Sequence, residues 1–449
     1  MGETDTLYTS DGRPIRWAHI QALHILQSIE KLHLGNKVKN DHIFYYRLKM
    51  RVFLATQVLS DSVADAIEFC REVLKHPDFF NSSGTCDFLR TFNRIFDLLD
   101  SKMPFGKNHK VPLKKENKAL WTTTFEETKN FILGLHYGVV SEQTPKRRKK
   151  ECTVLTGPRK RCFIGFLVNM ISYASIFEIY VEKRELLQYI LGHKMSQDHL
   201  ELMFGLVRSS LGSNNNPTVL QFKSSFRKMI LGASHVGLYE NCMVQDETEI
   251  LLPAKLKKNI SLVEETYALE DDNSVELYLE RFEQENLSEF QANILNYISG
   301  YIQKKIVSKE LCVYCHEYLE NMESGNAKDL LRIKNRGGLT APTRSVEKVV
   351  KICNTLLTPI LLKSNLFAEK NLVNNIAVQV CNIVNELHPD LFKNLDKHVE
   401  NLGSHKNKLI KKIVSLFVTM RARHHCKLQN SQRTKVRVQL SKLILFKNQ

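Results

Sequence analysis

Helical spacing of apolar residues is the feature that most constrains the fold of this chain. Across residues 14–140, apolar side chains recur at three- and four-residue spacing, as in Trp17, Ile20 and Leu23, and the same periodicity returns from Leu287 almost to the C-terminus. Strand signals are sparse and fall at residues 153–155 and 435–440. The pattern therefore predicts a mostly α-helical protein with a small α/β part.

Breaks in this pattern divide the chain into domains. Residues 141–161 contain prolines, glycine and a run of basic residues at 146–150, which is typical of an exposed linker. Residues 241–290 hold thirteen acids against four bases, which indicates an acidic linker or surface excursion. The expected packed segments are residues 11–140, 162–240 and 291–449.

Length and composition exclude several classes of protein. A chain of 449 residues that is 43% hydrophobic is long and apolar enough to form several packed domains. We find no stretch of about 18 apolar residues and expect no membrane-spanning helix. The polar, acidic start does not resemble a secretory signal. Ten cysteines at irregular spacing favour a reducing compartment over a disulfide scaffold.

The positive charge is concentrated at the C-terminal end of the chain. The net charge is +16, and residues 401–449 carry twelve Lys or Arg with no Asp or Glu. Such an excess predicts a polyanionic partner, of which nucleic acid is the commonest. Two alternatives stay open, namely a basic helical surface that keeps the protein soluble and pairing with the acidic residues 241–290.

Residues 194–208 predict a capped amphipathic helix. Ser196 is a suitable N-cap, and Asp198 in the first turn complements the helix dipole. The buried stripe is expected to consist of Leu200, Met203, Phe204 and Val207. Asp198 and Glu201, three residues apart, share another face. Spacing alone indicates only a helix cap followed by an exposed acid.

The wider segment, KMSQDHLELMFGLVRSSLGSNNNPTVLQFKSSFRKMIL, closely resembles the signature of the P-element-type DNA transposases and their THAP-domain vertebrate relatives. That signature is an S/T-Q-D-H-x-E-x-F-F helix, an Asn-rich turn and N-P-T-x-x-Q-F, from which Met203 is a mild departure. The family's GTP-binding insertion domain is similar to two further segments, GNKVKNDHIFYYRLKMRVFLATQVLSDSVADAIEF and FLRTFNRIFDLLDSK. The family's C-terminal region is similar to ISGYIQKKI and KNRGGLTAPTRSV. The resemblance extends from about residue 11 to residue 449 and implies a helical insertion domain, the C-terminal portion of an RNase H-like fold and a helical C-terminal domain.

The resemblance implies phosphoryl transfer by two Mg²⁺ ions, which need converging carboxylates. In this family Glu201 would be the third catalytic acid and metal ligand, and Asp198 would belong to the nucleotide side. The first two family aspartates lie upstream of the insertion domain, whereas Asp5 and Asp11 stand outside the family's sequence context. We therefore expect an N-terminally truncated transposase, a domesticated remnant or an incomplete gene product that does not cut or join DNA alone.

The resemblance also implies a guanine nucleotide pocket. No GxxxxGK[ST] motif is present, so such a pocket is not of the P-loop type. By resemblance its residues are Lys37, Val52, Ser60, Asn93, Phe96 and Asp97. A carboxylate such as Asp97 accepts two hydrogen bonds from the guanine edge, and an aromatic ring such as Phe96 stacks on the base. Without the resemblance, Phe96 reads as core and Asp97 as a surface acid. Asp100 stands where the family has Asn.

Two further patterns suggest a metal site and nuclear import. Cys312 and Cys315 form a CxxC pair that is either half of a zinc site or two free thiols. The candidates for the remaining zinc ligands are His424, His425 and Cys426. The basic run at 146–150 is either a nuclear localisation signal or a solvated linker.

Together these observations predict a nuclear, P-element-like transposase fragment with GTP as an organising cofactor and with DNA and a guanine nucleotide as partners. They predict no membrane association and are compatible with a homo-oligomer. The alternatives are a domesticated, non-catalytic nuclear DNA-binding or regulatory protein, and a helical interaction scaffold.

Overall fold

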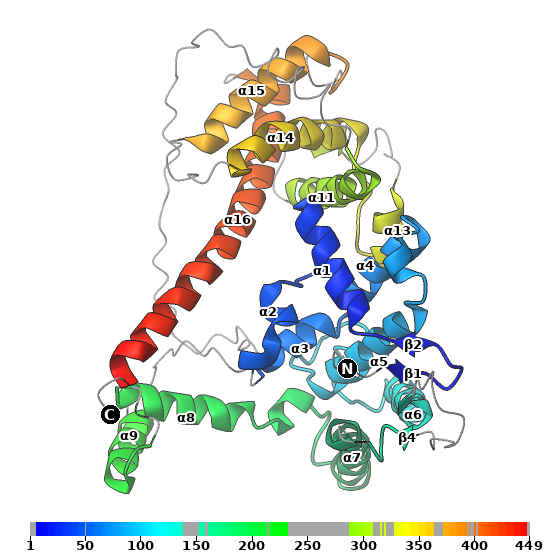
Figure 1. Cartoon of the computed structure of the whole chain (residues 1–449), viewed down its shortest axis with the longest axis vertical. Helices are drawn as coiled ribbons and strands as arrows, with labels where there is room; N and C mark the ends of the chain where they lie inside the picture. The colour runs from blue at the N-terminus through cyan, green and yellow to red at the C-terminus, as the bar shows by residue number, and fades with distance from the viewer. Residues whose placement is uncertain are drawn as a thin grey trace, which may run out of the picture. The chain divides into compact units, whose positions relative to one another are not determined.

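The computed structural model describes residues 6–49, 51–137, 152–157, 160–212, 214, 216–231, 287–308, 315–316, 318–319, 327–362, 371–392, 395, 399–400 and 403–446. It divides into two compact units, unit 1 (Met1–Lys258) and unit 2 (Asn259–Gln449). Both are built mainly from helices, as Figure 1 shows, which confirms the predicted fold class. The basic run at 146–150 and nearly all of the acidic segment at 241–290 lie outside the described residues.

Unit 1 contains a small antiparallel sheet. It contains β1 (Leu7–Tyr8), β2 (Pro14–Ile15), β3 (His136–Tyr137) and β4 (Cys152–Thr153) in the order β2-β1-β3-β4. The sheet brings the start of the chain next to the segment that follows the main helices. Since β4 pairs with β3, residues 152–153 are part of the packed unit, and the prediction of a linker is wrong at this point.

Helices make up most of unit 1 and carry the predicted site residues. They are α1 (Ala18–Glu30), α2 (Asn40–Ile43), η1 (Tyr45–Arg47), α3 (Val52–Val58), α4 (Asp61–Glu72), η2 (Pro77–Phe79), α5 (Ser83–Leu99), α6 (Lys118–Gly134), α7 (Lys160–Phe177), η3 (Glu178–Lys183), η4 (Gly192–Met195), α8 (Asp198–Ser210) and α9 (Val219–Leu231). Helix α5 is strongly amphipathic and buries Phe88, Phe92 and Ile95 between its neighbours. Its C-terminal end therefore has a fixed position in the unit.

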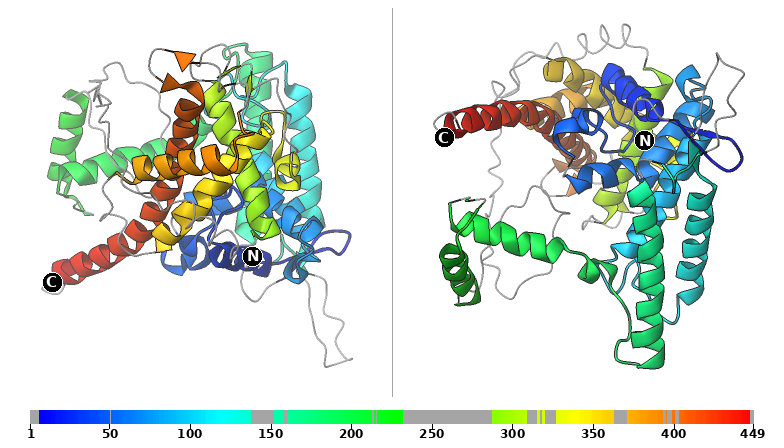
Figure 2. Two further views of the ribbon diagram at one scale, coloured as in Figure 1. Left: turned by 90° about the horizontal axis from the view of Figure 1, so that it is seen from above. Right: turned by 60° about the horizontal axis from the view of Figure 1, so that its bottom comes forward.

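Helix α7 and the π-helical turn η3 form one long apolar segment, which is seen end-on in Figure 1 and along its length in the right-hand view of Figure 2. Residues 160–183 are long and apolar enough to cross a membrane, so the expectation that no such stretch exists is wrong. Core helices pass the same test, and Phe163, Met170 and Phe177 pack into the core of unit 1. Its outer side, by contrast, leaves Ile171 67% exposed. Length and hydropathy alone are thus weak support for a membrane segment.

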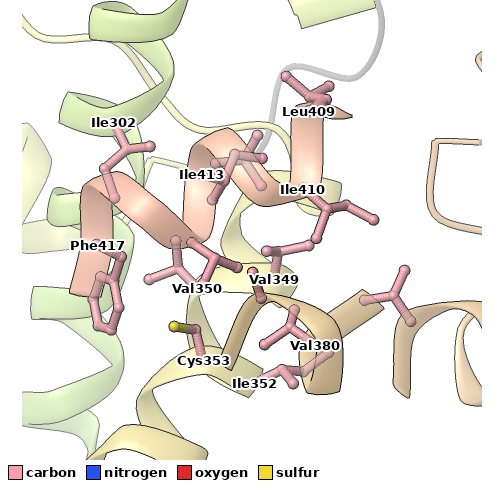
Figure 3. Packing of buried hydrophobic residues seen from close by; sticks show 14 of the residues in the cluster. Ile302, Val349, Val350, Ile352, Cys353, Val380, Leu409, Ile410, Ile413 and Phe417 are labelled. Carbon is pink, nitrogen blue, oxygen red and sulfur yellow. The ribbon is translucent and has the colours of Figure 1, made fainter. Parts of the chain in front are cut away.

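Unit 2 is a helical bundle. It contains α11 (Glu289–Val307), α13 (Asp329–Lys334), α14 (Arg344–Leu362), α15 (Leu372–Leu387), α16 (His405–Phe446) and the strand pair β5 (Val399–Glu400) and β6 (Gly403–Ser404). Figure 3 shows its core, where Val350 and Cys353 of α14 meet Ile413 and Phe417 of α16. The strand expected at 435–440 is wrong, because these residues continue α16.

Candidate functional site

The C-terminal end of α5 carries three of the predicted nucleotide-binding residues. Asn93, Phe96 and Asp97 lie on the side of α5 that is only partly covered, and all three are half-buried. The Nδ2 atom of Asn93 donates a hydrogen bond to Oδ2 of Asp97 over 3.4 Å. The side chain of Asp97 is 22% exposed, and Phe96 is not among the core residues. Both side chains are thus placed between core and surface, where a ligand can reach them.

Asp97 is a poorly solvated carboxylate. Burial raises its pKa to about 6, and the negative charges of Asp61 and Asp100 add to this rise. The Nζ atom of Lys110, 3.9 Å from Oδ1, acts in the opposite direction. Burial also raises the pKa of Asp100. Two acids thus share the C-terminal end of a helix, where the helix dipole disfavours negative charge, so N–H donors or a cation would stabilise them.

A buried histidine holds the loop that carries Lys37. The backbone N–H of Lys39 donates to Nδ1 of His42 over 3.0 Å, and Nε2 of the same ring lies 3.0 Å from Oε1 of Gln57 in α3. Burial lowers the pKa of His42 and so favours the neutral ring that this bridge needs. The bridge fixes the exposed Lys37 relative to α3, the helix that begins at Val52.

The remaining predicted nucleotide residues lie at helix starts. Val52 opens α3 and is 51% exposed, while Ser60 precedes α4 and donates through Oγ to the carbonyl of Gln57 over 3.0 Å. Asp61, the residue after Ser60, acts electrostatically on Asp97, so the start of α4 lies near the end of α5. That Lys37 and Val52 share one pocket with Asp97 stays a prediction.

Helix α8 carries Asp198 and Glu201 but differs from the expected helix in two ways. Gln197, rather than Ser196, directly precedes it, although the Ser196 hydroxyl still accepts a hydrogen bond from the Asp198 N–H over 3.4 Å. Glu201 is exposed, and its Oε1 accepts a hydrogen bond from Nε2 of Gln197 over 3.0 Å.

The predicted buried stripe of α8 is also wrong. Of its four residues only Val207 is buried, and Leu200 is 57% and Phe204 45% exposed. Among the described residues, α8 packs mainly against α9, and this packing leaves Leu200 and Phe204 largely uncovered.

A cluster of three possible metal ligands joins α5 to α8. Asp100, His193 and Asp198 each place one ligand atom within 4.8 Å of the others. The Nδ1 atom of His193 lies 3.1 Å from Oδ1 of Asp100. Sequence reasoning treated Asp100 only as a departure from the family and missed His193, although this histidine stands just before the Ser-Gln-Asp motif.

Close backbone packing holds this junction. The N–H of Gly192 donates to Oγ of Ser101 over 3.1 Å, and the N–H of His193 donates to the Ser101 carbonyl over 3.2 Å. The hydroxyl of Tyr173 lies 3.2 Å from the carbonyl oxygen of Leu99 and 3.0 Å from that of Gly192, and donates to one at a time. A Cβ atom at Gly192 would lie 2.1 Å from the Leu99 oxygen, so only glycine fits.

Within the described residues, His424, His425 and Cys426 do not join Cys315 in the predicted zinc site, and a site that includes Cys312 stays a prediction. Cys312 lies outside the described residues. Cys315 is buried, and its Sγ atom lies 3.5 Å from Nδ1 of His405, the first residue of α16. His424, His425 and Cys426 stand on the same helix, roughly 28 Å or more beyond His405 at 1.5 Å per residue, so they cannot complete a site at Cys315.

Among the side chains that the structure describes, helix α16 separates most of its basic residues from its apolar ones, although Lys406 is buried. The exposed basic residues are Lys408, Lys411, Lys412 and Arg423, and the opposite face buries Leu409, Ile410, Ile413, Val414, Phe417 and Val418. Arg421 of the same helix is not on the exposed face, because it is half-buried, and burial lowers its pKa to about 10. The side chains from Lys427 onward lie outside the described residues.

Three family models match the chain. Residues 1–112 match the TNP-like GTP-binding insertion domain, residues 193–227 the TNP-like RNase H C-terminal domain, and residues 286–427 the C-terminal domain of DNA transposase THAP9. DNA transposase THAP9 of Homo sapiens is 26% identical over 430 residues, which cover 91% of this chain and 46% of the relative. This chain is a homologue of the P-element-type DNA transposases.

A second curated relative and a solved structure are also similar to parts of the chain. The transposable element P transposase of Drosophila melanogaster is 26% identical over 318 residues, covering 67% of this chain and 38% of the relative. A solved structure, the Drosophila P element transposase strand transfer complex, aligns with a TM-score of 0.41 and 26% identity over 51% of this chain and 48% of that one. The chain thus spans less than half the length of either curated relative. In this P-element-type homologue, α5, α8 and most of the described α16 fall within the three matched regions.

Proposed function

We propose that this chain acts as a P-element-type transposase component that binds a guanine nucleotide at the C-terminal end of α5 and DNA along the basic face of α16. The homology supports a transposase-like function. The observation that carries the nucleotide proposal is the poorly solvated carboxylate of Asp97, which lies in the region that matches a GTP-binding insertion domain.

Asp97 suits a guanine base for a chemical reason. Guanine presents two adjacent N–H donors on one edge, and a single carboxylate accepts both. Adenine presents an acceptor at one of these positions, which the carboxylate repels. Asp97 is half-buried and its pKa is raised, so its ionised carboxylate is poorly solvated. Two N–H donors of a base would supply the hydrogen bonds that water does not. The half-buried ring of Phe96 is placed to stack on the base, and the exposed Lys37 is suited to phosphate.

Thermal unfolding with and without nucleotide tests this proposal. A ligand that binds only the native state raises the melting temperature, so GTP should raise it and ATP should not. The variant Asp97→Ala should lose the response to GTP. Asp78→Ala is the matched control, because Asp78 is an exposed acid elsewhere in unit 1 and its loss should leave the response unchanged. Equal shifts with GTP and ATP, or no shift with either, would overturn the guanine pocket.

DNA strand transfer needs more than the described residues supply. Two-metal catalysis requires several converging carboxylates. In the described part of the chain, the cluster of possible metal ligands contains Asp198 but not Glu201. We therefore assign Mg²⁺-dependent strand transfer, with Glu201 as one ligand, only to an assembly that brings further carboxylates to α8.

A second candidate function is that of a non-catalytic nuclear DNA-binding or regulatory protein. The exposed basic face of α16 favours it, because this face needs no metal to contact phosphates. Nicking of DNA in Mg²⁺ or Mn²⁺ that disappears in Glu201→Gln would support the enzyme instead. Nuclear import is part of both proposals, and replacing the basic run at 146–150 in a fluorescent fusion tests it.

A further inference from the structure

We propose that Asp100, His193 and Asp198 form a binding site for a divalent transition-metal ion at the junction of α5 and α8. The proposal goes beyond the function given above, which gives no role to Asp100 or His193, and beyond the resemblance, which implies only a place for Asp198 on the nucleotide side. It concerns the chain without nucleotide and without DNA.

The geometry of the three side chains fits one ion. Ligand atoms at about 2.1 Å from a shared ion lie at most about 4.2 Å apart. The three ligand atoms here lie within 4.8 Å of one another, so inward movements of less than about 1 Å bring them to that range. Side-chain rotations of a few degrees supply such movements without a change in backbone.

The backbone that carries these side chains is already fixed. Asp100 ends α5, and His193 is held in η4 by the hydrogen bonds of Gly192 and His193 to Ser101. His193 is only 8% exposed. Among the described residues its ring hydrogen-bonds to Asp100 through Nδ1 and packs against the ring of His199, with the two centroids 4.9 Å apart. A buried imidazole beside two carboxylates is thus held in place for an ion.

The charges around the cluster also favour a cation. Asp100 and Asp198 repel one another, and Asp100 lies at the negative end of the α5 dipole. Lys102 offsets part of this charge at Asp100. A divalent ion would neutralise both carboxylates and remove the need for either to be protonated.

The donor set indicates which class of ion binds. Mg²⁺ prefers oxygen ligands and keeps its water, whereas imidazole suits Zn²⁺, Fe²⁺ and Ni²⁺. Mn²⁺ prefers carboxylates but, as a transition metal, also accepts an imidazole beside them. One imidazole and two carboxylates therefore select a transition metal over Mg²⁺ and leave coordination positions for water. Mn²⁺ is the probe of choice, because its free concentration is read by electron paramagnetic resonance and the thiols of this chain compete less for it than for Zn²⁺.

The experiment is a titration of Mn²⁺ into the full chain without nucleotide or DNA. We expect one strong site, which Asp100→Asn and His193→Ala each weaken by at least roughly tenfold. Asp78→Asn and Glu126→Gln, exposed acids elsewhere in unit 1, are the matched controls and should keep the wild-type affinity, whereas Asp97→Asn and Glu201→Gln test the neighbouring acids. The melting temperatures without metal report whether each variant is folded. In the wild type, Mn²⁺ should broaden the ring signals of His193 and of His199, whose ring centroid lies 4.9 Å from that of His193, before those of the other histidines, a readout that needs no variant.

Each other outcome contradicts the proposal. Loss of the ion in Glu201→Gln but not in His193→Ala would place the ion at the predicted catalytic acid. Loss in Asp97→Asn would place it with the nucleotide acceptor, and Mg²⁺ competing as well as Mn²⁺ would remove the role of the imidazole. The proposed function is tested separately, since the difference between GTP and ATP and its loss in Asp97→Ala do not depend on this result.

Discussion

The Nδ1 atom of His193 lies 3.1 Å from the Oδ1 atom of Asp100, and this pair joins the end of α5 to the segment that leads into α8. The two residues belong to regions that match different family models, a GTP-binding insertion domain and an RNase H C-terminal domain. Asp97 lies one turn before Asp100, and Glu201 lies one turn after Asp198. The candidate nucleotide site and the candidate catalytic helix therefore share one rigid connection.

Gly192→Ala should weaken this connection. The new methyl group would meet the Leu99 oxygen at 2.1 Å, so the junction must open, at an expected cost of about 1–3 kcal/mol in the free energy of unfolding. Gly165→Ala is the matched control, because a Cβ atom at this position of α7 meets nothing within 4 Å. It should be neutral or stabilise by up to about 1 kcal/mol. Urea unfolding of both variants measures this, and equal stabilities would contradict the packing described here.

Asp97 should make stability depend on pH in a defined window. Its pKa is about 6 in the folded chain against a reference value of 3.8, so the folded state holds the proton more tightly. Its contribution to stability is therefore full below pH 3.8 and is lost as pH rises through 6. Asp97→Asn should gain roughly 2–3 kcal/mol over the wild type between pH 4 and pH 7. Asp78→Asn, an exposed acid, should show no such trend in urea unfolding.

The basic face of α16 should set the salt dependence of DNA binding. Removing the whole helix is not a usable test, because Ile413 and Phe417 belong to the core of unit 2. The informative variant replaces Lys408, Lys411 and Lys412 by alanine. Each lost phosphate contact reduces the slope of log affinity against log salt by about 0.9, and binding should show little sequence preference.

A second triple variant controls for net charge in this measurement. It replaces Lys115, Lys129 and Lys183 of unit 1, which are exposed lysines, by alanine. This variant should keep the wild-type slope. Equal slopes in the wild type and both triple variants would show that the lysines of α16 do not contact DNA. A lowered melting temperature in the variant of Lys408, Lys411 and Lys412 would favour pairing of these lysines with the acidic residues 241–290.

The sequence predicted the long helices because their apolar periodicity is strong. Helix α5 follows from Phe88, Phe92 and Ile95, which are indeed buried. Strands of two residues, such as β1 and β2, are too short to show an alternating pattern and were not foreseen. The residues at 435–440 alternate like a strand, yet the helix that precedes them continues through them.

The candidate site was only partly predictable for a different reason. The resemblance pointed to Asn93, Phe96 and Asp97, and one turn of α5 brings them together. His193 lies 93 residues from Asp100 and His405 lies 90 residues from Cys315, so no local spacing reveals either pair. The exposure of Leu200 could not be foreseen either, because an amphipathic pattern shows which face is apolar and not what covers it.

The most direct measurement is calorimetric titration of GTP and of xanthosine triphosphate into the wild type and Asp97→Asn. Xanthine has a carbonyl oxygen where guanine has its amino group, so a carboxylate repels it and the amide of asparagine donates to it. The wild type should bind GTP at least about tenfold more tightly than xanthosine triphosphate, and Asp97→Asn should reverse this preference. If Asp97→Asn binds both nucleotides as the wild type does, Asp97 does not contact the base and no guanine pocket lies at the end of α5.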